Sequence, residues 1–363
     1  MRVGATAVVP GKGTWIRSKR PAASQEIATP VVPIPTAELE PDLPSPATGV
    51  ISTRCSSSRY SARLARGAGL CTRGARNDLG MSMTNDHISV TPFSRSVGAE
   101  IAGVDLATPP DEPQLAVIRR ALGQYGVVFF RDQQLTPEQH IAFARCFGDI
   151  NVNRFFATVP GFPMIAEVRK EPEQQRNIGN GWHTDHSYDE APALGSMLYA
   201  REVPKTGGDT LFASMYAAYD ALSDGLKATL EGLRALHSSR HVFGAVAAAR
   251  RGDLNGRIRN PEFATQDAIH PVVIRHPDTG RKVLYVNPGF TLRFDGWTEE
   301  ESHPLLDYLY RHAARPEFTC RFQWREGSLA FWDNRSTWHF AVNDYHGERR
   351  LLHRITIEGE RLG

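Results

Sequence analysis

Cysteine is scarce in this 363-residue sequence, which contains only four. Cys55, Cys71, Cys146 and Cys320 form no CxxC or CxxH pair, so neither a disulfide framework nor a zinc ribbon is expected. Long apolar runs are also missing, because no segment reaches the roughly 18 residues that a membrane-spanning helix needs. No internal repeat is visible. We therefore expect no membrane partner, and reduced thiols suit a cytoplasmic protein.

Acidic residues are missing from residues 43–77, where six arginines occur. Residues 1–80 hold 11 Lys and Arg against 5 Asp and Glu, which leaves 31 against 35 for the remainder. The positive charge thus belongs to the N-terminal segment, and no nucleic-acid partner is expected. Six prolines between positions 30 and 46 disfavour regular elements there. We expect residues 1–80 to be a spurious upstream extension, with a disordered tail or an organelle transit peptide as alternatives.

What is present is ordinary globular composition, with 41% hydrophobic and 23% charged residues. Apolar runs predict strands at residues 88–92, 99–104, 127–130, 272–274, 283–287, 318–324, 328–332 and 351–357. Helical spacing predicts helices at residues 112–124, 136–147, 216–222 and 226–233, the second starting with Thr136 as N-cap. A mainly β chain with helices confined to insertions favours a double-stranded β-helix, or jelly roll, in one domain over residues 85–363.

Two histidines and an aspartate are the strongest candidates for chemistry. His183 and Asp185 are two residues apart, so on a strand they point to the same face. His339, from a late apolar segment, would complete the two-His, one-carboxylate triad of non-haem Fe(II) oxygenases, which leaves three coordination positions open. Taken singly, the first pair is more often a turn and a solvated histidine, and His339 a packed core residue. Their combination favours a metal site.

Two arginines follow the last histidine. Arg350 and Arg354 share one face if residues 349–358 form a strand. Each alone could be a surface partner of an acidic residue. Beside a metal triad, an arginine fork is well suited to grip a carboxylate.

These residues belong to a series of ordered blocks in the sequence. The blocks are WHTD at 182–185, GGDTL at 207–211, HPVV at 270–273, HP at 276–277, LYVN at 284–287, GFT at 289–291, WDNR at 332–335 and RRLLHR at 349–354. With them the sequence resembles the TauD/TfdA family of Fe(II)- and 2-oxoglutarate-dependent dioxygenases over residues 88–358, nearly the whole predicted domain.

The resemblance implies a jelly roll and an oxidoreductase. It implies that His183, Asp185 and His339 ligate Fe(II), and that Thr210 and Arg350 hold the distal carboxylate of the cosubstrate 2-oxoglutarate. O2 would then oxidise a small anionic organic substrate by hydroxylation, with release of succinate and CO2. Family members often self-associate, so a homo-oligomer is also expected.

The substrate contacts depart from the taurine enzymes. Arg354 matches the family position that binds the substrate anion, with a second contact to 2-oxoglutarate or a salt bridge to a buried aspartate as alternatives. Asn153 and Phe156 replace a histidine and a tyrosine, and His186 replaces a small apolar residue. Taurine is therefore in doubt, and a sulfonate, sulfate ester or carboxylate is expected. Taurine itself or an aryloxyalkanoate is the alternative substrate, and a zinc-type metal hydrolase or a non-catalytic binding protein is the alternative function.

Overall fold

Nine strands form the largest sheet in the described part of the chain. The structure of the protein is a computed structural model that describes residues 88–362 except 251 and 255, and the prediction for residues 1–80 lies outside the described residues. The strand order of the nine-stranded sheet is β1 (Ser89–Pro92), β2 (Ala99–Ala102), β3 (Val127–Phe130), β15 (Leu329–Asp333), β7 (Gly195–Glu202), β17 (Arg350–Ile357), β6 (Phe162–Lys170) and β5 (Thr158–Val159). The ninth strand, β4 (Ile150–Asn151), also pairs with β17. All pairs are antiparallel except β2 with β3.

A smaller antiparallel sheet carries part of the candidate site. Its order is β14 (Thr319–Phe322), β8 (Thr210–Ser214) and β16 (Thr337–Ala341), and His339 of β16 lies opposite Phe212 of β8. Two further sheets extend the fold, namely β10 (Asp267–Pro271), β9 (Arg234–Ser238) and β13 (Thr291–Phe294), and the pair β11 (Val273–Arg275) and β12 (Lys282–Leu284).

Aromatic side chains fill the space between the large and the small sheet. Phe129 of β3 stacks on Phe322 of β14 with ring centroids 4.1 Å apart, and it lies 5.6 Å from the ring of Phe212 on β8. All three are fully buried. Strand side chains alternate between faces, so each sheet presents one apolar set to the other. The result is the predicted jelly roll, in which strands from opposite ends of the chain become neighbours.

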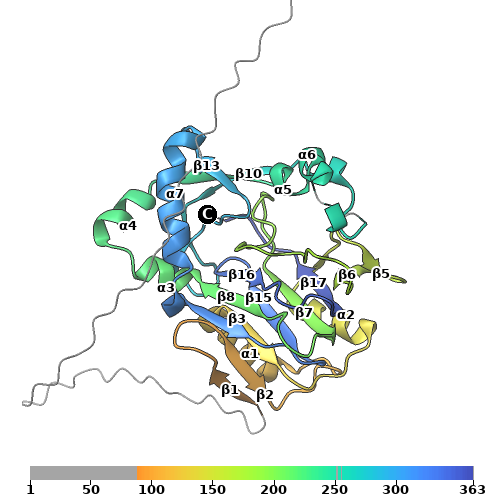
Figure 1. The fold of residues 1–363 in the computed structure, drawn as a ribbon. Helices are drawn as coiled ribbons and strands as arrows, with labels where there is room; N and C mark the ends of the chain where they lie inside the picture. Colours follow the sequence, from red (N-terminus) through yellow and green to blue (C-terminus); the bar gives the residue numbers. More distant parts are fainter. Residues whose placement is uncertain (1–87, 251, 255, 363) are drawn as a thin grey trace, which may run out of the picture. The chain divides into compact units, whose positions relative to one another are not determined.

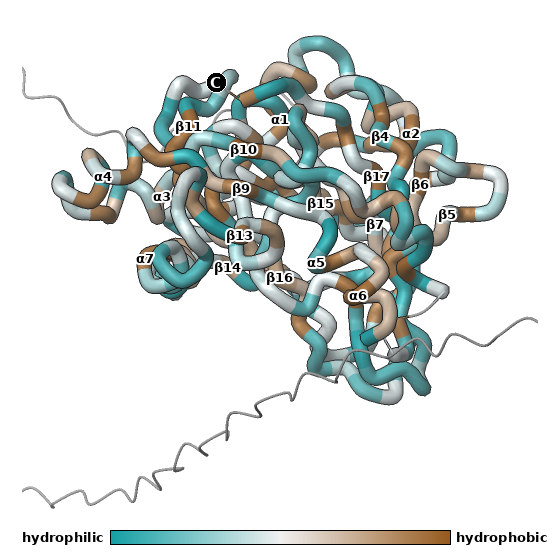
Figure 2. Tube along the Cα trace, turned by 90° about the horizontal axis from the view of Figure 1, so that it is seen from above, coloured by the Kyte–Doolittle hydropathy of each residue, from teal (hydrophilic) through white to brown (hydrophobic). Residues whose placement is uncertain are grey.

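Three short 3-10 helices, Gly252–Leu254, Pro261–Phe263 and Pro316–Phe318, and seven α-helices are described among residues 88–362. The α-helices cover the sheets from outside. These are α1 (Glu112–Tyr125), α2 (Pro137–Arg145), α3 (Met215–Asp220), α4 (Asp224–Leu230), α5 (Arg240–Phe243), α6 (Ala245–Ala249) and α7 (Glu299–Ala313). In Figure 1, α7 runs beside α3 and α4 on one flank, while α5 and α6 lie on another. Figure 2 shows brown apolar segments concentrated among the packed strands and helices, and teal segments in many outer loops. No helix of this described part combines the length and apolarity needed to cross a bilayer.

Most predicted elements are present. The helix start at Thr136 is confirmed in detail, because its side chain caps Gln139 and the Gln139 side chain returns to the Thr136 backbone. The chain at His183 and Asp185 does not form the strand on which the prediction of a shared face depended. There His183 makes only an isolated bridge, and the chain turns immediately afterwards. Two further elements, α7 and the central strand β7, were not predicted from the sequence.

Candidate metal and cosubstrate site

The three predicted metal ligands converge on one point. His183 and His339 exchange backbone hydrogen bonds of 3.1 and 2.8 Å, which holds their rings 4.1 Å apart between centroids. Asp185 lies across from both, with Oδ1 3.8 Å from Nε2 of His183 and Oδ2 3.9 Å from Nε2 of His339. One candidate ligand atom from each residue lies within 4.8 Å of the other two. Their separations suit three ligands around one ion.

A tight turn, rather than a strand, brings Asp185 beside His183. His186 follows with a φ of 59°, in the left-handed region that only a few non-glycine residues adopt. Gly289 packs against His183 so closely that an added Cβ would lie 2.6 Å from the His183 Cβ. The backbone bridge, the turn and this glycine replace the strand geometry that the sequence suggested.

The protonation states of the three ligands fit a divalent metal. His183 Nδ1 lies 2.8 Å from the carbonyl of Gly181, which can only accept, so this nitrogen carries the proton and Nε2 presents its lone pair to the site. Burial lowers the pKa of both the His183 and the His339 imidazoles. Burial alone would raise the pKa of Asp185, but the positive charge of Arg354 opposes this effect, and that pKa lies well below its usual range. Two neutral imidazoles and one carboxylate are the donor set of non-haem Fe(II) sites.

Thr210 and Arg350, the predicted carboxylate-binding pair, lie beside each other in one cavity with the three predicted metal ligands. Trp324 donates from Nε1 to the Thr210 hydroxyl at 2.9 Å, and Arg350 approaches that oxygen at 3.5 Å. Since both neighbours can only donate, the Thr210 proton is free for a ligand. The Arg350 Nε is buried and has no partner among the described residues. A carboxylate would satisfy both groups, which is what the distal end of 2-oxoglutarate offers.

One cavity of about 520 Å³ collects every residue that the sequence analysis assigned to the site. Its lining includes the predicted metal ligands His183, Asp185 and His339, the pair Thr210 and Arg350, and the predicted substrate contacts Asn153, Phe156, His186 and Arg354. Arg354 pairs with Asp185 at 2.8 Å, which was one of the alternatives weighed for it. Its Nε is buried without a partner in the described chain, so it retains donor capacity.

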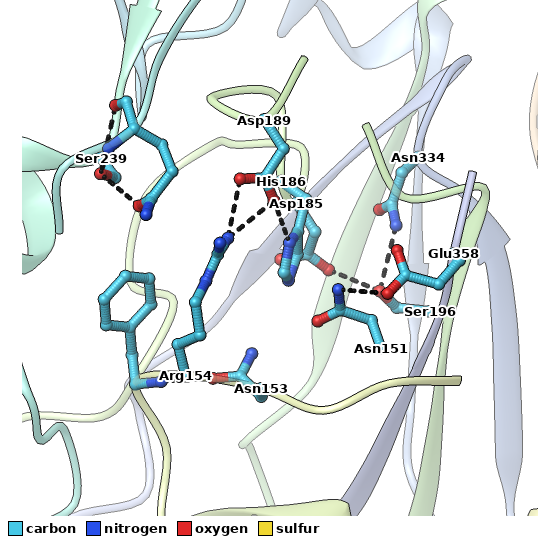
Figure 3. Close-up of polar contacts among 12 residues, drawn as sticks. Asn151, Asn153, Arg154, Asp185, His186, Asp189, Ser196, Ser239, Asn334 and Glu358 are labelled. Carbon is cyan, nitrogen blue, oxygen red and sulfur yellow. Dashed lines mark hydrogen bonds and ion pairs between the residues drawn. The ribbon is translucent and has the colours of Figure 1, made fainter. Parts of the chain in front are cut away.

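The other predicted substrate contacts have defined local roles. Asn153 Oδ1 accepts hydrogen bonds from the backbone of Phe155 and Phe156, which fixes this turn. The Arg354 guanidinium lies 5.4 Å from the centre of the Phe156 ring. His186 Nδ1 lies 2.9 Å from Asp189, and Asp189 accepts two bonds from Arg154 (Figure 3).

An aromatic wall on one side of the cavity was not identified from the sequence. Phe156, Tyr188, Phe243 and Phe290 are buried in one apolar cluster and all line the cavity. The Tyr188 and Phe290 ring centroids are 4.8 Å apart. These residues come from four separate segments, so no local pattern links them. Trp324, beside Thr210, was missed for the same reason.

A second group of side chains that could ligate a metal, His276, Asp278 and Asp333, already has hydrogen-bond partners within the protein. His276 Nε2 lies 3.0 Å from buried Asp333, while its Nδ1 accepts from the backbone of Asp278 and Thr279. Arg335 donates hydrogen bonds to the carboxylates of both Asp278 and Asp333. The histidine has no free lone pair, so this cluster holds the loop before β16 together rather than binding a metal.

Comparison with known proteins decides the family. The family model described as "Taurine catabolism dioxygenase TauD, TfdA family" matches residues 89–356. The chain belongs to this family. An alkylsulfatase of Acinetobacter baylyi is 36% identical over 266 residues, covering 73% of this chain and 83% of the relative. An alpha-ketoglutarate-dependent sulfate ester dioxygenase of Pseudomonas putida is 32% identical, covering 75% and 90%.

Solved structures agree with the fold. A taurine dioxygenase from Burkholderia xenovorans shares 39% identity with a TM-score of 0.64, over 76% of this chain and 92% of that one. The structure of AAD-2 in complex with Mn(II) and N-oxalylglycine shares 31% identity with a TM-score of 0.62, over 77% and 99%. The chain is therefore a TauD/TfdA-type jelly-roll enzyme, a dioxygenase that uses Fe(II), 2-oxoglutarate and O2. These relatives give no support to the zinc hydrolase alternative.

Proposed function

We propose that His183, Asp185 and His339 hold the Fe(II), and that Thr210 and Arg350 hold 2-oxoglutarate in the same cavity. This proposal rests on one observation: two neutral imidazoles and an ionised carboxylate lie close together, beside a buried Thr–Arg pair. The reaction hydroxylates a substrate C–H bond. One oxygen atom of O2 enters the product, the other enters succinate, and CO2 leaves 2-oxoglutarate.

The side chains have separate tasks in this reaction. Bound iron supplies the oxidising chemistry, and the protein supplies geometry, orientation and exclusion of water. Arg350 and Thr210 fix the far end of the cosubstrate, so that its 2-oxo acid end faces the metal ligands. The buried aromatic wall keeps bulk water away from the reacting C–H bond.

The charge of the cavity supports an anionic substrate. Its buried charged side chains are Arg350, Arg354 and Asp185, which together leave one net positive charge. Fe(II) adds two positive charges and 2-oxoglutarate removes two. One positive charge therefore remains to balance a monoanionic substrate. Because Arg350 is engaged with Thr210, Arg354 is the guanidinium that we assign to this anion. Asn153 and His186, on the same lining, are the polar neighbours that we assign to this end of the substrate.

The aromatic wall supports an apolar body behind that anion. Phe156, Tyr188, Phe243 and Phe290 offer no charged partner for the ammonium group of taurine. We therefore assign the enzyme to sulfate esters, sulfonates or carboxylates that carry an alkyl or aryl group. The Acinetobacter baylyi relative is named an alkylsulfatase, and one from Sphingobium herbicidovorans is named a (S)-phenoxypropionate/alpha-ketoglutarate-dioxygenase.

A substrate panel tests this assignment. With Fe(II), 2-oxoglutarate and O2, we expect a medium-chain alkyl sulfate, an alkanesulfonate or phenoxyacetate to accelerate succinate formation well above taurine. Phe243→Ala should raise the KM of the best apolar-tailed substrate and leave that of 2-oxoglutarate unchanged. Preference for taurine would contradict the substrate assignment, whereas no O2-dependent succinate with any substrate, and no anaerobic charge-transfer band of Fe(II) with 2-oxoglutarate, would contradict the site.

A further inference from the structure

A chain of buried hydrogen bonds ends at the carboxylate of Asp185 and fixes its position. Trp332 donates from Nε1 to Asn334 Oδ1 at 2.8 Å, Asn334 donates from Nδ2 to Ser196 Oγ at 3.1 Å, and Ser196 donates to Asp185 Oδ2 at 2.8 Å. The last two bonds are visible in Figure 3. All four residues are buried.

The direction of this chain is fixed by its first member. An indole N–H can only donate, so the Asn334 amide must turn its oxygen toward Trp332 and its NH2 toward Ser196. The Ser196 oxygen then accepts, and its single proton is left for Asp185. The Asn334 backbone is itself anchored, since its N–H donates to Leu194 and its carbonyl accepts from Thr184.

The second oxygen of Asp185 is also reached by Arg354, whose Nη2 lies 2.8 Å from Oδ2. Two donors therefore occupy the lone pairs of Oδ2. The other oxygen, Oδ1, faces His183 Nε2 at 3.8 Å. Oδ2 lies equally close to the other candidate ligand, 3.9 Å from His339 Nε2, so both oxygens border the metal site. The protein donors engage only Oδ2, which leaves Oδ1 as the oxygen with free lone pairs for a metal.

We propose that the Trp332–Asn334–Ser196 chain makes Asp185 a one-oxygen metal ligand, with Ser196 as a positioning residue. This rests on the proposed function, in which Asp185 ligates the iron. An Fe(II) ion held by two histidines and a one-oxygen carboxylate would keep open positions for 2-oxoglutarate and O2. A carboxylate bound through both oxygens would take one of these. Ser196 therefore protects the position that O2 needs, without touching substrate or cosubstrate.

Metal binding tests the proposal without relying on turnover. In Ser196→Ala we expect the Kd for Mn(II), measured by the EPR signal of free Mn(II), to rise about 10–100-fold, the usual cost of losing an outer hydrogen-bond partner of a metal ligand. Asn334→Asp should have a similar effect, because its carboxylate cannot donate and draws the Ser196 proton away from Asp185. Ser196→Thr, which retains the hydroxyl, should keep the Kd for Mn(II) close to that of the unmodified protein.

Controls separate this proposal from the metal assignment. Ser302→Ala removes a buried serine hydroxyl of α7, bonded to Thr298 and to the backbone of Phe294, and should leave the Kd for Mn(II) unchanged. His183→Ala should abolish binding. If it does, while Ser196→Ala and Asn334→Asp bind as the unmodified protein does, the positioning proposal is overturned and the metal site stands. If His183→Ala also binds normally, the metal assignment itself fails.

Discussion

At the scale of single residues, two neighbouring arginines divide between the site and the surface, Arg350 at the start of β17 and Arg349 just before it. Arg350 is buried in the cavity beside Thr210, while Arg349 is half-exposed and pairs with Glu171 and Glu202. Alternation along the strand explains the division, since consecutive side chains point to opposite faces. Arg354, four residues on, returns to the cavity face.

This division gives a first prediction. Arg350→Gln should raise the KM for 2-oxoglutarate about 10–100-fold, because a hydrogen bond to a charged group contributes about 1.5–3 kcal/mol. The Kd for Mn(II) should stay within about twofold, since Arg350 does not touch the metal ligands. Arg349→Gln is the matched control and should leave both values unchanged. Equal effects from the two variants would contradict the assignment of Arg350.

His140 on α2 gives a pH prediction. Burial, aided by the positive charges of His353 and Arg201, lowers the pKa of His140 to about 3. The unfolded chain, with a histidine pKa of about 6.5, therefore binds more protons between these values, and the free energy of unfolding falls as pH drops from about 6.5 to 3. The slope from this residue is up to about 1.4 kcal/mol per pH unit.

Urea unfolding between pH 7 and pH 4 measures this slope. His140→Phe should flatten it, because the imidazole that must stay neutral in the fold is gone. Exposed His303 on α7 is the matched control, and His303→Gln should keep the slope. An unchanged slope in His140→Phe would assign the acid sensitivity to other groups.

At the scale of elements, α7 forms although its interior contains a residue that disfavours helix, because its N-terminal capping and its buried face stabilise it. Pro304 lies inside this helix, where it removes a backbone donor, and three glutamates crowd the first turn. The helix forms because Thr298 and Glu301 cap its start reciprocally, because acidic side chains favour the positive end of the helix dipole, and because Leu306 and Leu309 are buried.

Loss of this cap gives a third prediction. Thr298→Ala should lower the free energy of unfolding by about 1 kcal/mol, the usual cost of removing an N-cap side chain. Exposed Glu300 is a suitable control, and Glu300→Ala should change the stability by less than half as much. Activity per folded molecule should not change in either variant, because α7 contributes no residue to the cavity.

The elements also show where sequence patterns were sufficient. The capping box at Thr136 and the apolar run of β3 are local signals, and both were predicted correctly. The pair His183 and Asp185 was predicted to share a strand face, yet a turn with His186 at positive φ brings them together. Backbone pairing with His339 and close packing against Gly289 shape this turn, and both partners are remote in sequence.

At the scale of the whole molecule, the described domain should be stabilised by its own ligands. A ligand that binds only the folded state at 100 times its Kd adds about 2.7 kcal/mol. Mn(II) with 2-oxoglutarate under argon should therefore raise the Tm by several degrees. Asp185→Ala should abolish the shift caused by Mn(II), and Arg350→Gln should remove mainly the additional shift caused by 2-oxoglutarate. A Tm that does not respond in the unmodified protein would contradict the proposed site.

The sequence by itself determined the reaction class and the identity of the side chains that we assign to it. Spaced blocks such as WHTD and RRLLHR are covalent facts of the chain, so two histidines, an aspartate and two arginines could be identified without coordinates. Only the tertiary structure decided how these side chains face one another. The aromatic wall, the Trp324 contact to Thr210 and the Ser196 contact to Asp185 join residues from remote segments, and tertiary packing of these segments, rather than any local periodicity, creates them.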